Sequence, residues 1–170
     1  MLFRSIEFDP APGADLLLVG DETAAPAVCA VLEQLPHDAV GTAFLEVPVA
    51  ADVQDVRRPA GVELVWLPRE GEELGHRLHD AVVAHLGIAG AEVEVAADEV
   101  DPDLWETPSY SSSGEEVADG APGVGGTYAW IAGESTVLTG LRRHLVNELG
   151  FDRSRVAFMG YWRRGVAMRS

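Results

Sequence analysis

Short apolar runs alternate with stretches of helical spacing along most of the chain, and this alternation constrains the fold most strongly. The first run, Asp15 to Val19, is closed by Gly20, and apolar residues then recur at helical spacing from Ala24 to Leu35. Further runs lie at 39–47, within 61–71, and at 127–135 and 155–162, and two more helical patterns span 74–86 and 137–149. Strands buried on both faces of a parallel sheet read as such continuous runs. We therefore predict an α/β fold: a three-layer parallel sheet of about five strands with helices on both faces.

Residues 89–126 interrupt this alternation. The segment is rich in proline, glycine, serine and acids, and no arginine occurs between Arg77 and Arg142. We predict a mainly irregular loop insertion here, with one short strand at 91–95. The expected organisation is an N-terminal extension (1–14), one domain (15–165) carrying this insertion, and a short tail (166–170).

The net charge of −16 excludes some partners. All twelve basic residues are arginines. This acidity argues against nucleic acid and against an anionic membrane surface. The single cysteine, Cys29, cannot form an intramolecular disulfide and is expected in buried packing. With no apolar run of transmembrane or leader type, we expect a soluble, cytoplasmic protein.

A parallel sheet of this kind binds ligands at the carboxyl ends of its strands. In this sequence that edge is expected to gather four segments, namely 20–23, 66–69, 132–135 and 160–164. Candidate binding residues are therefore sought in these four segments.

The first segment has two acids where a phosphate-binding turn usually carries glycine. Gly20 closes the strand, and Thr23 is expected to cap the following helix. Asp21 and Glu22 oppose close phosphate contact by charge. Their residue types suit a helix cap, a bond to a ribose hydroxyl, or a position facing a neighbouring cofactor. An ordinary helix start with acids in its first turn is the alternative.

The other segments carry small, aromatic and basic residues. Ala132 and Gly133 allow close approach of backbone or a flat ring, and Ser135 is expected to cap the next helix. Tyr161 and Trp162 could stack on a flat cofactor, with the adjoining arginines pairing with phosphate or carboxylate. An ordinary strand–helix junction and rim packing are the respective alternatives.

Arg69 follows the third apolar run, where the 2′-phosphate of a nucleotide is often bound. A lone surface arginine is the alternative. His76, His79 and Asp80 share one helical flank, but no further ligand cluster supports a metal site. We predict no metal site, and no catalytic residue stands out.

Four stretches together resemble the C-terminal domain of the siderophore-interacting proteins, which are flavin-dependent ferric-siderophore reductases of the ferredoxin-reductase superfamily. They read VGDETAAPA, WLPR, YAWIAGES and LRRHLVNELGFDRSRVAFMGYWRRG. The likeness runs from about Asp15 to Gly165, apart from the insertion. The last stretch is the most specific.

The resemblance implies an NAD(P)H-binding domain of the ferredoxin-reductase type. In the family, hydride passes from nicotinamide to an FAD held by a preceding barrel, and electrons then reach siderophore-bound iron(III). By residue match, Thr23 would contact nicotinamide or flavin, and Arg69 an adenosine phosphate, which favours NADPH over NADH. The nicotinamide half would lie over Ala132, Gly133, Glu134 and Ser135, and the flavin near Tyr161, Trp162 and Arg163.

The residues before Asp15 are too few for the flavin barrel, and this leaves three alternatives. The first is an NAD(P)H-binding reductase component that delivers hydride to a flavin, FAD, on a separate chain. The second is a non-catalytic module that binds a nucleotide or a ferric siderophore and has lost redox activity. The third is a homo-oligomer that buries Tyr161, Trp162 and Trp105 between subunits, which is compatible with either of the others.

Overall fold

The computed structural model describes residues 8–86, 105–107, 110–111 and 126–165. The described residues form a mixed sheet with the order β3-β2-β1-β6-β7-β4-β5, in which the five strands from β3 to β7 in this order are parallel. Its parallel strands are β1 (Asp15–Gly20), β2 (Val40–Val47), β3 (Val62–Pro68), β6 (Thr127–Glu134) and β7 (Val156–Trp162). This confirms the predicted α/β class and all five predicted main strands, with boundaries shifted by a residue or two.

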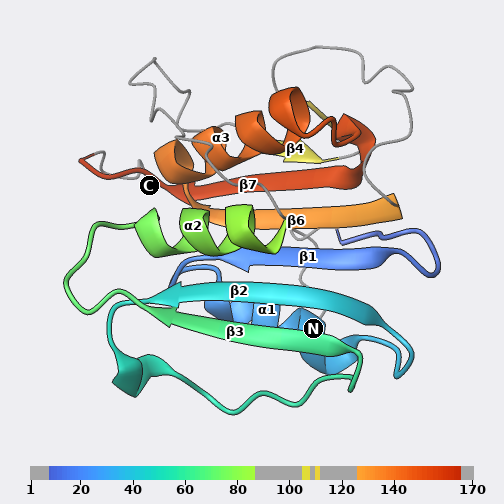
Figure 1. Ribbon diagram of the computed structural model, residues 1–170, viewed down its shortest axis with the longest axis horizontal. Helices are drawn as coiled ribbons and strands as arrows, with labels where there is room; N and C mark the ends of the chain where they lie inside the picture. Colours follow the sequence, from blue (N-terminus) through green and yellow to red (C-terminus); the bar gives the residue numbers. More distant parts are fainter. Residues whose placement is uncertain (1–7, 87–104, 108–109, 112–125, 166–170) are drawn as a thin grey trace.

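Helices cover both faces of the sheet (Figure 1). Helix α1 (Ala25–Gln34) lies behind the sheet in this view, whereas α2 (His76–His85) and α3 (Ser135–Arg143) lie in front of it. Short 3-10 turns occur at Ala50–Asp52 and Arg153–Arg155, and α3 continues into a π-helical turn at His144–Glu148. Among the described residues, no helix is long and apolar enough to span a membrane.

Strand β1 shows why the sheet requires helices on both sides. It pairs with β2 on one side and with β6 on the other. Leu16 and Leu18 pack into the apolar cluster beneath α1, whereas Leu17 and Val19 pack into the cluster beneath α2 and α3. All four side chains are at most 4% exposed. A continuous apolar run thus supplies two cores, as period-two alternation requires.

Two short strands lie within the predicted irregular insertion, and that prediction was wrong at these positions. Strand β4 (Trp105–Thr107) pairs antiparallel with β7, and β5 (Tyr110–Ser111) pairs antiparallel with β4. This hairpin covers the outer edge of β7 at Phe158 and Met159, where an unpaired strand would present free N–H and C=O groups. The strand predicted at 91–95 lies outside the described residues.

Candidate functional site

The carboxyl ends of β1, β6 and β7 are joined by the carboxylate of Asp21, which is only 3% exposed. Its Oδ1 accepts hydrogen bonds from the Thr23 backbone N at 2.9 Å and from the Thr23 hydroxyl at 2.5 Å. Its Oδ2 accepts from Glu134 N at 2.8 Å and from the indole Nε1 of Trp162 at 3.0 Å. We call this arrangement the Asp21 clasp. It brings three of the four predicted segments together.

The clasp explains the acid at the tip of the first turn. Asp21 Oδ1 also lies 3.4 Å from Ala24 N, and the Asp21 carbonyl accepts from Ala25 N. The backbone donors that a phosphate would need are therefore already bound within the turn. The carboxylate of Asp21 thus holds the turn that leads into α1.

Thr23 is not the N-cap of α1, so that prediction was wrong. The N-cap is Ala24, which has no side-chain hydrogen bond, and Pro26 follows in the first turn as expected. The hydroxyl of Thr23 donates to Asp21 instead. The carboxylate of Asp21, two residues upstream, accepts from the backbone N of Thr23 and Ala24, which leaves the threonine hydroxyl as a donor to that acid.

Gly133 allows the clasp to close. Its φ of +146° is in a region that residues with a side chain rarely adopt, and a Cβ here would lie 2.6 Å from the Asp21 carboxylate. Gly20, at the end of β1, and Ala132 are buried next to each other in the sheet. The small residues of this segment thus allow a close approach, and in the structure the group that approaches Gly133 is the carboxylate of Asp21.

Ser135 is not the N-cap of α3, which is a second correction. The cap is Glu134, whose Oε2 accepts from Val137 N at 2.9 Å while its Oε1 accepts from Arg164 N at 3.1 Å. The Ser135 hydroxyl donates to the Trp162 carbonyl at 3.1 Å. The longer glutamate side chain reaches both the helix start and the chain beyond β7.

The aromatic segment at the end of β7 is anchored from two sides. Trp162 is bound through its indole to Asp21 and through its carbonyl to Ser135. Tyr161 is half-buried against the core beneath α1, and this burial, with the negative charge of Asp21, raises the pKa of its phenol. Arg163 follows β7 and is partly buried. The structure thus brings these residues to the predicted edge.

Arg69, at the end of β3, is engaged by two carboxylates. Its Nη1 and Nη2 lie 2.7 and 2.9 Å from the two oxygens of Glu22, and its Nη1 lies 3.3 Å from Glu46. This bidentate pair lowers the pKa of Glu22 and raises that of Arg69. The side chain of Arg69 is only 13% exposed, so it is neither lone nor on the open surface.

Glu46 was not predicted from the sequence to belong to the site. It is fully buried near the end of β2, and its carboxylate accepts from Gly75 N at 2.8 Å and Leu78 N at 3.3 Å. It therefore binds the start of α2 as well as Arg69. The sequence did contain a signal for this residue, because Glu46 is an acid among apolar residues at the carboxyl end of a predicted strand, in the stretch AFLEV.

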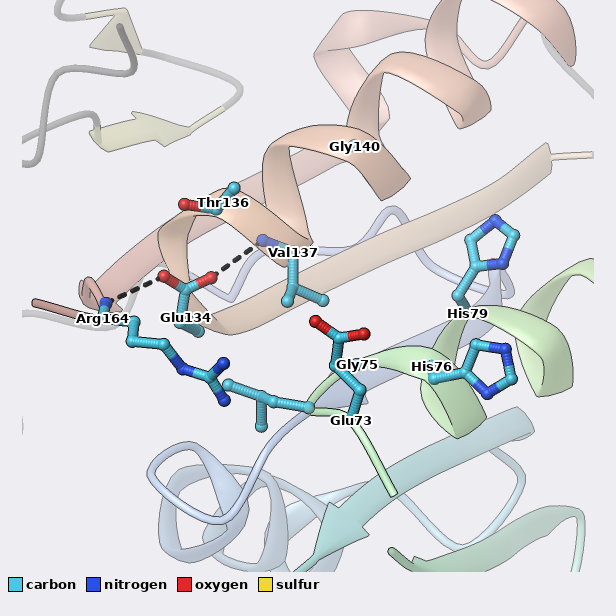
Figure 2. A pocket seen from close by; sticks show the side chains of 10 residues that line it. Glu73, Gly75, His76, His79, Glu134, Thr136, Val137, Gly140 and Arg164 are labelled. Carbon is cyan, nitrogen blue, oxygen red and sulfur yellow. Dashed lines mark hydrogen bonds between the residues drawn. The ribbon is translucent and has the colours of Figure 1, made fainter. Parts of the chain in front are cut away.

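A recess of about 320 Å³ opens at the same edge, between the starts of α2 and α3 (Figure 2). We call it the α2–α3 recess. Gly75, with a φ of +85°, packs directly against Val137 and so holds the two helix starts together. The recess is lined by Glu73, Leu74, Gly75, His76, His79, Glu134, Thr136, Val137, Gly140 and Arg164.

The histidines of the recess form no metal centre in the part of the chain that the structure describes. His76 is exposed and lies 3.8 and 3.9 Å from the carboxylates of Glu72 and Asp80. His79 is partly buried, and this burial lowers its pKa, so its ring is neutral at neutral pH. Both rings lie on the α2 side of the recess (Figure 2).

A second recess, of about 360 Å³, lies on the α1 side, lined by residues that include Glu22, Cys29, Pro48 and Trp66. Cys29 is half-buried and packs against the core beneath α1, and burial raises the pKa of its thiol. Cys29 is therefore more exposed than the buried packing position expected from the sequence. A thiol with a raised pKa is a weak nucleophile at neutral pH, so its chemistry is that of a packing residue.

Comparison with known proteins extends these observations. The family model described as siderophore-interacting protein matches residues 13–165. An uncharacterized protein of Mycobacterium tuberculosis is 34% identical over 161 residues, which is 93% of this chain and 48% of the relative. Ferric vibriobactin reductase of Vibrio cholerae is 28% identical over 149 residues, or 88% of this chain and 43% of that protein.

Solved structures agree with these relatives. A siderophore utilization protein from T. fusca superposes with a TM-score of 0.62 at 33% identity, covering 94% of this chain and 49% of that one. The siderophore-interacting protein SipS from Aeromonas hydrophila gives 0.58 at 30% identity, covering 93% and 54%. The chain thus spans about half the length of the relatives it matches. With a family model matching nearly its whole length, this chain belongs to the siderophore-interacting protein family.

Proposed function

We propose that this chain is the NAD(P)H-binding component of a ferric-siderophore reductase. The observation that carries the proposal is the α2–α3 recess, which opens at the carboxyl edge of the sheet beside the Asp21 clasp. Ligands of open parallel sheets bind at this edge. Membership of the siderophore-interacting family and the reductase name of one relative support the class of reaction.

The residues present fit the adenosine half of a pyridine nucleotide. A volume of about 320 Å³ is within the range of small-molecule sites. Leu74, Val137 and Gly140 offer apolar surface for a flat base. Glu73 offers an acceptor for the sugar hydroxyls, and Arg164 offers a cation for the phosphates. In this proposal the recess holds the ADP-ribose half.

The nicotinamide half would lie nearer the clasp, beside Thr23 and Gly133. The nucleotide supplies a hydride for a flavin, FAD, held outside these 170 residues, and the electrons serve to reduce iron(III) in a siderophore. The role of this chain is orientation. Asp21 fixes the turn that carries Thr23, the backbone at Gly133–Glu134 and the indole of Trp162 in one geometry.

Calorimetric titration of the purified chain with ADP-ribose and with NADH tests this function. We expect binding by the wild type and its loss in Gly140→Trp, which fills the recess from α3. Asn147→Trp is the matched control, because this exposed residue lies outside the recess, and it should bind as the wild type does. Thr23→Trp should weaken NADH binding while leaving ADP-ribose binding intact.

The outcomes separate the proposal from its alternatives. Absence of binding at millimolar nucleotide would refute a reductase component. Nucleotide binding without electron transfer to added FAD under any condition would favour the non-catalytic binding module instead. Equal loss of binding in Asn147→Trp would show that the effect of Gly140→Trp is not specific to the recess.

A further inference from the structure

Arg69, the arginine expected to bind the adenosine phosphate of the nucleotide, does not face the α2–α3 recess. Both terminal nitrogens of Arg69 are bound by Glu22, and Nη1 also contacts the buried carboxylate of Glu46. Arg69 does not belong to the lining of the recess, although its partner Glu46 binds Gly75, which does. The guanidinium is therefore held behind the recess wall by two acids of its own chain.

The charges that do line the recess are mainly negative. Glu73 and Glu134 contribute carboxylates, and Arg164 contributes one guanidinium. The backbone N of Arg164 donates to Glu134, which anchors the main chain, while the guanidinium of Arg164 extends separately along the recess and supplies the arginine charge of its lining (Figure 2). His79 adds no charge at neutral pH, because burial lowers its pKa, and His76 lies between the carboxylates of Glu72 and Asp80.

This arrangement bears directly on the nucleotide that the recess can accept. A 2′-phosphate carries a charge of about −1.5 to −2 and is normally met by an arginine, whereas a free 2′-hydroxyl is normally met by an acid. Glu73 is an exposed carboxylate on the rim of the recess, and it forms no ion pair with a cation among the described residues. Its residue type suits a ribose hydroxyl and repels a phosphate.

Resting on the function proposed above, we propose that the recess selects the nucleotide with a free 2′-hydroxyl, NADH, over NADPH. Glu73 is the acceptor for the ribose hydroxyls. Glu22 is a specificity-determining residue that acts indirectly, by holding Arg69 away from the ligand. This preference is the opposite of the one that Arg69 suggests in the sequence.

The test compares ADP-ribose with 2′-phospho-ADP-ribose by calorimetry, because these probes contain only the half of the nucleotide that the recess would hold. We expect the wild type to bind ADP-ribose at least about tenfold more tightly. NADH and NADPH should show the same order. Equal affinity, or tighter binding of the phosphorylated probe, would overturn the inference and leave the proposed function standing.

Glu22→Gln tests the role of the ion pair. Glutamine cannot hold Arg69 as a charged bidentate partner, so Nη2 loses its acidic partner while Nη1 keeps its contact with Glu46. The charge of the guanidinium is then less neutralised and can attract a 2′-phosphate, so the preference for ADP-ribose should fall at least about fivefold. Glu63→Gln is the matched control. It removes an exposed carboxylate of β3, the strand that ends next to Arg69, at a position outside the recess, and the preference should not change.

Glu73→Gln supplies a second line of evidence from an exposed position that the fold does not need. It should reduce the preference by weakening ADP-ribose binding and by removing a charge that repels the phosphate. An unchanged preference in both Glu22→Gln and Glu73→Gln would overturn the assignment of these residues. Failure of the wild type to bind either probe would overturn the proposed function together with this inference.

Discussion

Two adjacent acids of one turn, Asp21 and Glu22, have opposite environments. Asp21 is 3% exposed and is bound entirely by neutral donors, which come from its own turn, from β6 and from the end of β7. Glu22 has a side chain that is 33% exposed and pairs with one cation, Arg69. Asp21 is fixed by the geometry of its hydrogen bonds, which no other residue type reproduces. Glu22 can be replaced with a small loss of stability.

The difference shows that one short turn contains both an acid that fixes the local structure, Asp21, and an acid that influences ligand choice, Glu22. A buried carboxylate that satisfies several donors cannot be removed without leaving those donors unpaired. An ion pair whose acid is 33% exposed is screened by solvent and contributes little to stability, so its effect is mainly on where the arginine is held. Mutations of the clasp should therefore alter folding, and mutations of the pair should alter ligand choice.

The largest effect is expected for Asp21→Asn, which should lower the free energy of unfolding by about 3 kcal/mol. The amide nitrogen would face a backbone N–H or the indole N–H, so buried donors would lose their acceptor. Urea denaturation followed by tryptophan fluorescence measures the change. Asp15→Asn makes the same chemical change at an exposed position and should have almost no effect, and equal losses in the two variants would contradict the clasp.

Gly133→Ala should have the next largest effect, a loss of about 2 kcal/mol in the free energy of unfolding, measured in the same way. A methyl group would strain the backbone at φ +146° and would overlap the Asp21 carboxylate. Gly13→Ala separates the two causes, because Gly13 also has a positive φ, of +76°, but a methyl group there would meet no atom within 4 Å. A loss at Gly133 no greater than that at Gly13 would show that the contact with Asp21 is unimportant.

Glu22→Gln should have the smallest effect on stability, less than about 1 kcal/mol at neutral pH. Arg69 lowers the pKa of Glu22 in the folded state below the unfolded value of about 4.3, so the pair stabilises the protein above that value. The contribution is lost as the pH falls through the folded pKa. The difference between wild type and variant in urea denaturation should therefore shrink as the pH is lowered below about 4.3, and a difference that grows on acidification would refute the ion pair.

The sequence determined the main architecture because it depends on local patterns. Continuous apolar runs followed by helical spacing identified the five parallel strands, the three helices and the edge where their ends meet. Family membership was likewise readable from short motifs such as VGDETAAPA and YAWIAGES. These features need no knowledge of long-range contacts, since periodicity fixes which face of each element is buried.

The tertiary structure alone decided which atoms are paired at that edge. Both predicted caps failed for reasons that involve other acids: Asp21 engages the hydroxyl of Thr23 in the turn before α1, and Glu134 takes the place of Ser135 as the cap of α3. The hairpin on β7 and the buried Glu46 depend on partners distant in sequence. Whether an arginine such as Arg69 faces a ligand or its own acids is set by side chains that converge from different strands, and spacing within one segment does not encode this.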